Sequence, residues 1–170
     1  MRKNKGFTLI ELLAVIVILA IIAVITVPKV AEMIDTSRKG SSEDAFYGAI
    51  KAAELGWAKA LQTDSTIGGQ TCVANGTAFT CTAVTGANVG NNAISISTSG
   101  SVPKAGTITL DGNGAASVAA TAALQFNGYH CCGNSSDVVC KRGSNPVAAD
   151  FATGADFASH TVAKTACGIS

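Results

Sequence analysis

The sequence predicts an α+β fold, in which one long N-terminal helix packs on an antiparallel β-sheet head that carries disulfides. Two observations predict it. The first part of the chain is an apolar stretch that continues at helical spacing, and the second part alternates short strand-like runs with Gly- and Asn-rich turns. At 170 residues the chain has room for one compact domain and an extension. We expect a leader at residues 1–6, a long helix at residues 7–62 and a β-rich globular head at residues 63–170.

The apolar stretch runs from Phe7 to Val27 and is long enough to cross a membrane. As a helix it would measure about 31 Å, which matches the hydrocarbon core of a bilayer. Glu11 is its only charged residue, and a short basic leader precedes it. Because basic flanks stay on the cytoplasmic side, we expect a single-pass precursor with its N-terminus inside. Ordinary signal-peptide cleavage would need a small residue where Lys29 stands, so the apolar helix is expected to stay attached to the mature chain.

Beyond Pro28 the pattern becomes amphipathic. Proline removes a backbone donor, and we predict a kink at Pro28 inside one continuous helix rather than the end of that helix. At residues 7–62 the helix would measure about 84 Å. One apolar stripe recurs at helical spacing, and we expect the sheet to cover it; its members are Phe46, Ile50, Ala53, Trp57 and Leu61.

From Thr63 onward the pattern is typical of short strands. Runs rich in β-branched or apolar residues are separated by turn residues. The runs that we expect to be strands are Ala93–Thr98, Thr107–Leu110, Ala122–Phe126 and Asp137–Cys140.

A hairpin is predicted between Cys72 and Cys81, because eight residues separate them. A two-residue turn at Gly76-Thr77, with Gly in the first central position as a type II′ turn prefers, places the two cysteines directly opposite each other. They would then form a non-hydrogen-bonded pair with Cα atoms about 4.5 Å apart, which a disulfide can span. A turn at Asn75-Gly76 would oppose Cys72 to Phe79 instead.

All six cysteines lie beyond residue 70, which indicates disulfides in a part of the chain outside the reducing cytosol. With Cys72–Cys81 paired, three connectivities remain for the other four, and we prefer Cys131–Cys140 with Cys132–Cys167. The same cysteines with His130 and His160 suggest a zinc cluster, but their spacing does not fit paired Cys-x-x-Cys knuckles.

The sequence indicates no cofactor, no metal and no enzymatic activity. Asp111-Gly112-Asn113-Gly114 resembles half of a calcium loop without the later acidic ligand, and no Gly-x-Ser-x-Gly elbow frames a nucleophile. The chain has 12 basic and 11 acidic side chains, a net charge of +1, which argues against a nucleic-acid-binding surface.

The motif that indicates function is Lys5-Gly6-Phe7-Thr8-Leu9-Ile10-Glu11-Leu12. It resembles the processing signature of type IV prepilins and of the pseudopilins of type II secretion. The resemblance extends over about the first 60 residues, through the apolar run and Pro28, and implies a pilin-like fold. It also implies that a membrane-embedded prepilin peptidase cuts after Gly6 and that Phe7 becomes an N-methylated N-terminus.

The same resemblance implies a structural role in an extracellular filament. The amine of Phe7 in one subunit would pair with Glu11 of a neighbour, and Pro28 would allow bending or local unwinding during assembly. The expected partners are further copies of the chain and other pilins, an assembly platform with its ATPase motor, and the membrane before assembly.

Three functions stay open at this point. The first is a pilin of a surface filament used for adhesion, motility or DNA uptake. The second is a pseudopilin of a secretion or DNA-uptake system. The third is an uncleaved, membrane-anchored binding module whose disulfide-linked head recognises a ligand.

Overall fold

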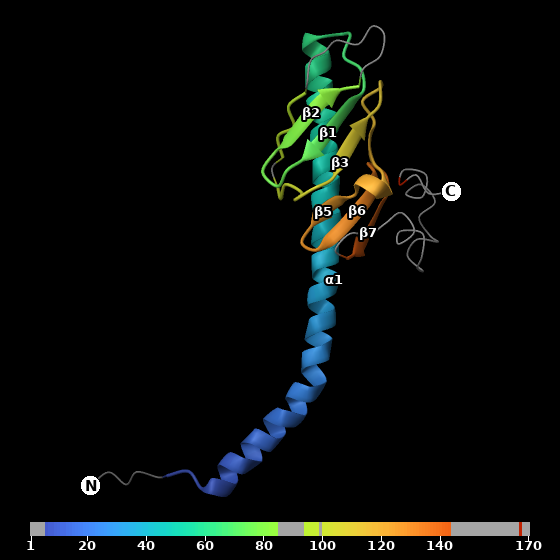
Figure 1. Ribbon diagram of the computed structural model, residues 1–170. Helices are drawn as coiled ribbons and strands as arrows, with labels where there is room; N and C mark the ends of the chain where they lie inside the picture. The colour runs from blue at the N-terminus through green and yellow to red at the C-terminus, as the bar shows by residue number, and fades with distance from the viewer. Residues whose placement is uncertain (1–5, 85–93, 99, 144–166, 168–170) are drawn as a thin grey trace, which may run out of the picture. The chain divides into compact units, whose positions relative to one another are not determined.

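The computed structural model describes residues 6–84, 94–98, 100–143 and 167. One helix, α1 (Leu9–Thr63), precedes a set of strands, which confirms the predicted α+β class (Figure 1). The strands are β1 (Gln70–Ala74), β2 (Phe79–Ala83), β3 (Thr107–Leu110), β4 (Ala116–Val118), β5 (Leu124–Phe126), β6 (Tyr129–Asn134) and β7 (Val138–Arg142), and a short 3-10 helix, η1 (Ala120–Ala122), lies between β4 and β5. The chain divides into two compact units at Arg38 and Lys39, so α1 contributes to both.

In the first unit, α1 is helical without interruption through Pro28. Proline has no backbone N–H to donate to the carbonyl four residues earlier, so one hydrogen bond of the helical ladder is missing there. The Thr26 hydroxyl donates to the Ile22 carbonyl at 3.0 Å, two residues before the missing bond. The helix is therefore continuous at this position, and the kink remains a prediction.

In the second unit, α1 packs one face against the sheet. Its buried residues follow helical spacing: Ser42, Phe46, Ala49, Ile50, Ala53 and Gly56. The predicted stripe is therefore confirmed for Phe46, Ile50 and Ala53. It is wrong for Leu61, which is 39% exposed. Trp57 closes the core one turn earlier, because its indole N–H donates to the Gly68 carbonyl at 3.1 Å and its ring lies against Gly114.

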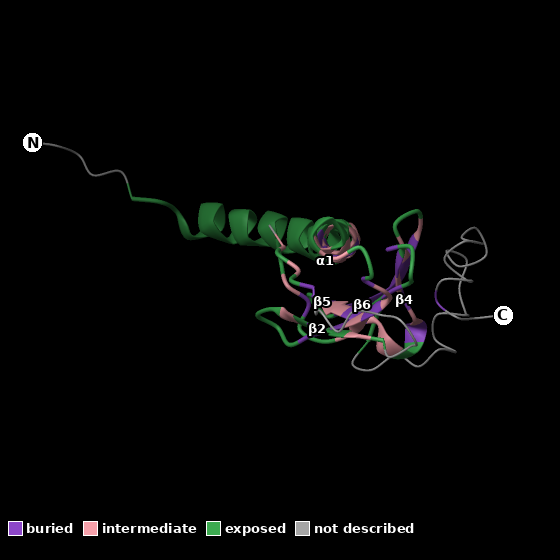
Figure 2. Ribbon diagram, turned by 90° about the horizontal axis from the view of Figure 1, so that it is seen from above, coloured by how far each residue is buried: buried purple, intermediate pink, exposed green. Residues whose placement is uncertain are grey.

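Among the described residues, seven strands form one sheet in the order β2-β1-β3-β4-β6-β5, with β7 paired to β6. Each of these pairs is antiparallel. One face of the sheet turns toward α1, as Figure 2 shows from above. The inward side chains of the sheet meet the helix in one apolar core that includes Cys72, Ile108, Leu110, Val118 and Leu124.

The strand predictions were right in part. Thr107–Leu110 is β3, and Asp137–Cys140 corresponds to β7, which runs from Val138 to Arg142. The run at 122–126 is shorter than predicted, because η1 occupies Ala120–Ala122 and β5 begins at Leu124. β4 and β6 were not predicted.

The strand predicted at Ala93–Thr98 is wrong. Ala93 lies outside the described residues, and residues 94–98 are irregular. Ile94 is buried in the core, and the carbonyl oxygen of Ser95 lies 2.8 Å from where a Cβ on Gly56 would stand. This segment therefore packs against α1, and its apolar residues serve that contact rather than a place in the sheet.

The hairpin register is confirmed. β1 and β2 place Cys72 opposite Cys81, the Asn75 amide donates to the Ala78 carbonyl at 3.2 Å, and Gly76 has a φ of 87°, as the predicted turn requires. The cysteines are bonded as Cys72–Cys81, Cys131–Cys140 and Cys132–Cys167, with Cα separations of 3.9, 4.1 and 5.4 Å. These are the pairs that the sequence analysis preferred.

Candidate processing and assembly site

The first residues of the described chain are fully accessible. Gly6 and Phe7 precede α1 in a segment without regular secondary structure, and Phe7 is 91% exposed. No heavy atom lies within 4 Å of the place where a Cβ on Gly6 would stand. A peptidase could therefore approach this backbone without displacing any part of the described chain.

Thr8 and Glu11 form a capping box at the start of α1. The Glu11 carboxylate accepts hydrogen bonds from the Thr8 backbone amide at 2.8 Å and from the Thr8 hydroxyl at 2.7 Å. In return, the Glu11 amide donates to the Thr8 hydroxyl oxygen at 3.3 Å. These contacts satisfy donors that a helix N-terminus leaves unpaired, and they place a negative charge at the positive end of the helix dipole.

The sequence analysis missed this local role of Glu11. The pattern Thr-x-x-Glu before an apolar run was present and is the usual signal of a capping box. Within one chain the carboxylate therefore has Thr8 as its partner. Its pairing with the amine of a neighbouring subunit remains a prediction.

The first half of α1 carries a continuous exposed apolar surface. From Leu9 to Ile34 its large apolar side chains are between 48% and 83% exposed. Among the described residues, α1 is the one helix that is long and apolar enough to cross a membrane. Apolar surface of this extent requires a cover of lipid or of other protein chains.

Charged residues return directly after Pro28. Lys29 and Glu32 form an ion pair at 3.1 Å, and both side chains are more than 70% exposed. An exposed pair of this kind adds little stability. The pair marks the end of the stretch in which Glu11 is the only charged residue.

In the head, the cysteines among the suggested zinc ligands form disulfides with each other. No cysteine is free, and the described residues contain no group of three side chains that could hold a metal ion. His160 lies outside the described residues. Asp111, the first residue of the half calcium loop, accepts from the amides of Asn113 at 2.8 Å and Ala115 at 2.9 Å, so its carboxylate fixes the β3–β4 turn.

Two titratable side chains of the head have shifted pKa values. Burial raises the pKa of Tyr47, and the nearby carboxylates of Asp137 and Glu43 raise it further. Burial lowers the pKa of His130 from its ordinary value of 6.5, while a hydrogen bond with the Gly143 backbone partly opposes that shift. Neither residue belongs to a group of side chains that could hold a metal ion in the part of the chain described here.

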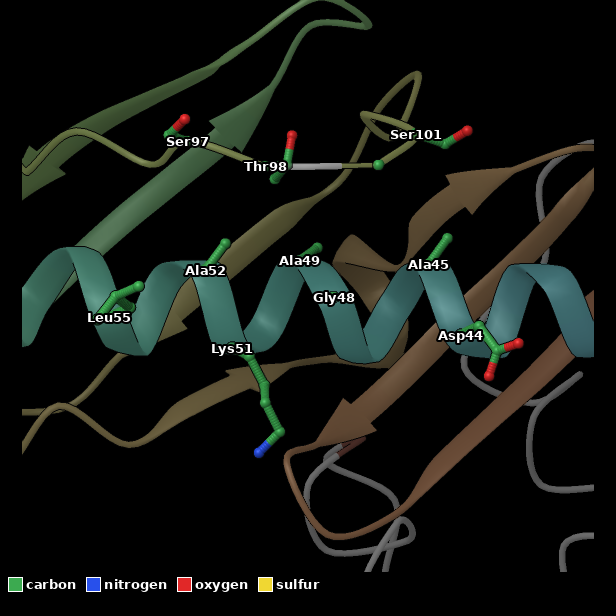
Figure 3. A pocket seen from close by; sticks show the side chains of 11 residues that line it. Asp44, Ala45, Gly48, Ala49, Lys51, Ala52, Leu55, Ser97, Thr98 and Ser101 are labelled. Atoms are coloured by element: carbon green, nitrogen blue, oxygen red, sulfur yellow. The ribbon is translucent and has the colours of Figure 1, made fainter.

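A groove of about 420 Å³ lies between α1 and a segment that contributes Ser97, Thr98, Gly100 and Ser101. Figure 3 shows the small side chains of Ala45, Ala49 and Ala52 on the side of the helix that faces this segment, while Lys51 points away. Asp44 is the only carboxylate among the residues that line it, and the lining includes no histidine or cysteine. This composition offers no catalytic constellation.

Comparison with known proteins concerns the N-terminal segment. Residues 1–27 match the family model described as the prokaryotic N-terminal methylation motif. This is the cleavage motif of prepilins and pseudopilins, and it supports a processed protein of that type. Together with the apolar helix it fits a membrane-anchored precursor. No curated protein and no solved structure matches the chain.

Proposed function

We propose that this chain is a structural subunit of a type IV pilus-like extracellular filament and not an enzyme. The observation that carries the proposal is the exposed apolar part of α1 up to Val27, in which Glu11 is the single carboxylate and which lies within the matched motif at residues 1–27. Such a surface suits a membrane first and a bundle of identical helices afterwards. The disulfide-linked head then forms the outer surface of the filament.

The first step is hydrolysis of the peptide bond between Gly6 and Phe7 by a prepilin peptidase. Glycine suits this position because it leaves the backbone open to close approach. Cleavage removes the basic leader and creates a new amine on Phe7, which is then methylated. The apolar helix stays attached, so the product is still anchored in the membrane.

Assembly uses Glu11 as a partner for that amine. A carboxylate inside the apolar core of a filament needs a counter-charge, and the amine of Phe7 in a neighbouring subunit supplies one. A buried pair of this kind adds little net stability, but leaving either member alone is costly. The pair therefore fixes the axial register of one subunit against the next.

Pro28 supplies local freedom during the same step. The missing hydrogen bond lets the helix bend or unwind locally as the subunit leaves the bilayer. Extraction from the membrane requires an assembly platform and an ATPase motor, and these are the partners that we propose besides other pilins.

Electron microscopy of the shear fraction of producing cells tests the proposal. Antibodies against the head should label extracellular filaments, and their subunits should begin at Phe7. Recovery of only detergent-extractable protein that retains residues 1–6 would contradict the proposal and favour a membrane-anchored binding module.

The motif at residues 1–27 fits a pseudopilin equally well, because the two classes share it. A pseudopilin would form a short fibre confined to the cell envelope. Labelled fibres that stay with the envelope fraction after shearing would assign the chain to that second class.

A further inference from the structure

Met33 is the single methionine of the mature chain. The sequence has two methionines, and the other, Met1, belongs to the leader that the proposed cleavage after Gly6 removes. Met33 is 73% exposed, more than the large apolar residues near it on the helix, Val30 at 52% and Ile34 at 48%. Any chemistry specific to methionine therefore acts on the mature chain at this one exposed position.

Water reaches this part of α1. Met33 follows Val27, the last residue of the apolar run, by six residues, or about 9 Å along a helix. Lys29 and Glu32 lie between them in the sequence, and both side chains are more than 70% exposed. Charged side chains at this level keep their water, because removing it is costly. A dissolved oxidant can therefore reach the Met33 sulfur in a subunit that is still anchored in the membrane.

Met33 also belongs to an apolar stripe of α1. Val30, Met33 and Ile34 have the spacing i, i+3 and i+4, which places side chains on one side of a helix. The stripe continues the exposed apolar surface that begins at Leu9. In the proposed filament this surface packs against neighbouring helices, and an unbranched thioether is suited to filling irregular gaps there.

Oxidation of the Met33 sulfur changes the chemistry of the stripe. Methionine sulfoxide carries a polar oxygen in place of a sulfur that is close to apolar. In water this oxygen is hydrated, but between packed helices it needs a hydrogen-bond donor. A buried polar atom without such a partner opposes packing.

We propose that Met33 is a modification site at which an oxidant of the peroxide class controls assembly, because the sulfoxide stops the subunit from joining the filament. The inference rests on the proposed function. The sulfur gives two electrons to the peroxide and forms a bond to one of its oxygens. The O–O bond breaks, and the second oxygen leaves as water with both hydrogens. Methionine sulfoxide reductases restore the thioether, so the modification is reversible.

The test uses producing cells from which existing filaments have been sheared. Protein synthesis is blocked, so that new filaments form from subunits already in the membrane. The stripped cells are treated with hydrogen peroxide until mass spectrometry shows Met33 fully oxidised, and the filaments that regrow are counted. Wild-type regrowth should fall at least about tenfold, because each oxidised subunit brings an unpaired polar oxygen to the packed surface.

Two variants separate this effect from general oxidative damage. Met33→Leu leaves the mature chain without methionine and should regrow filaments equally with and without peroxide. M33L/L55M moves the methionine to the position of Leu55, which is 55% exposed on the same helix. That variant should be oxidised and should still regrow filaments.

Sheared wild-type filaments provide a second readout. Neighbouring helices should cover Met33 there, so it should react with peroxide at least about tenfold more slowly than in the membrane pool. Equal rates in the two pools would overturn the proposal. Normal wild-type regrowth after full oxidation would also overturn it, as would an equal loss of filaments in M33L/L55M. Untreated wild-type cells that form no filaments would contradict the proposed function, and this inference with it.

Discussion

Glu11 accepts two hydrogen bonds from Thr8, at 2.8 Å from the amide and at 2.7 Å from the hydroxyl. The same carboxylate is the proposed partner of the Phe7 amine of a neighbouring subunit. Glu11 therefore has two roles that can be separated, one within its own helix and one between chains. Variants at the two residues of the capping box distinguish them.

Glu11→Val removes the carboxylate and leaves the amine of Phe7 without a partner. We expect cleaved, membrane-bound protein with a folded head and no filaments. Thr8→Val is the matched control, because it removes the hydroxyl contacts of the capping box and keeps the carboxylate; it should still polymerise. Counting filaments in the shear fraction checks both, and abundant normal filaments from Glu11→Val would end the pairing mechanism.

A second prediction concerns cleavage after Gly6. Intact-mass analysis of the exported protein should show loss of the first six residues and the addition of one methyl group at Phe7. Gly6→Val should leave full-length precursor in the membrane, because a side chain then blocks close approach to the scissile bond. Lys5→Arg, which keeps the charge of the leader, should be processed normally. A mature chain that begins near Glu32 would instead indicate ordinary signal-peptide cleavage.

The disulfides should differ in their effect on stability. Cys72–Cys81 and Cys131–Cys140 each have a sequence separation of 9, whereas Cys132–Cys167 has one of 35. Loop-closure entropy gives about 3 kcal/mol for each short loop and about 4 kcal/mol for the long one. Replacing each pair by alanines should therefore lower the free energy of unfolding most for Cys132 with Cys167. Denaturant titration measures this order, and non-reducing peptide mapping would expose any other pairing, such as Cys72 with Cys167.

Buried His130 should make the head less stable in acid. Its pKa is lowered in the folded protein, so below about pH 6.5 the unfolded chain binds more protons than the folded chain. The free energy of unfolding should fall as the pH drops from about 6.5 toward the folded pKa, and His130→Gln should reduce this slope. Urea titrations at several pH values measure it. An unchanged slope in the variant would assign the acid sensitivity to other groups.

The last prediction compares a buried and an exposed residue of α1 by their effect on the free energy of unfolding. Ile50 is fully buried, and Leu55, on the same helix, is 55% exposed. Ile50→Ala should lower the free energy of unfolding by about 2–5 kcal/mol, because a cavity forms between helix and sheet. Leu55→Ala should change it by about 0.5 kcal/mol or less. Equal effects would mean that α1 presents a different face to the core.

The sequence was most informative where one strong local signal decides the structure. A long apolar run can form little besides a helix, and the even number of residues between Cys72 and Cys81, with Gly76 in the first central position of the turn, predicts the hairpin register that the structure has. Ile94 and Ile96 lie in a segment that was predicted as a strand and is irregular. Their alternation is typical of a strand, but contact with α1 at Gly56 decides their conformation, and such tertiary contacts cannot be found from local pattern.

Two strands, β4 and β6, were not predicted. β4 has only three residues, and β6 combines two cysteines with Gly133, whose φ of 140° is unusual for a strand interior. Both strands pair with their neighbours in sequence, β4 with β3 and β6 with β5 and β7, and only the pairing of β4 with β6 joins strands that are not consecutive. The capping box of Thr8 and Glu11 is a different case. Its pattern, Thr-x-x-Glu before an apolar run, was visible in the sequence, but Glu11 was interpreted only as an assembly residue.

The bond between Cys132 and Cys167 also limits how far a subunit can be stretched. When a chain is pulled from both ends, tension passes through this covalent shortcut, and residues 133–166 cannot be drawn out. The Cys72–Cys81 bond removes residues 73–80 from the extensible length in the same way. A subunit under load can therefore lengthen only in the parts of the chain that lie between or outside these loops. The positions of the cysteines thus set the maximum extension of the oxidised head.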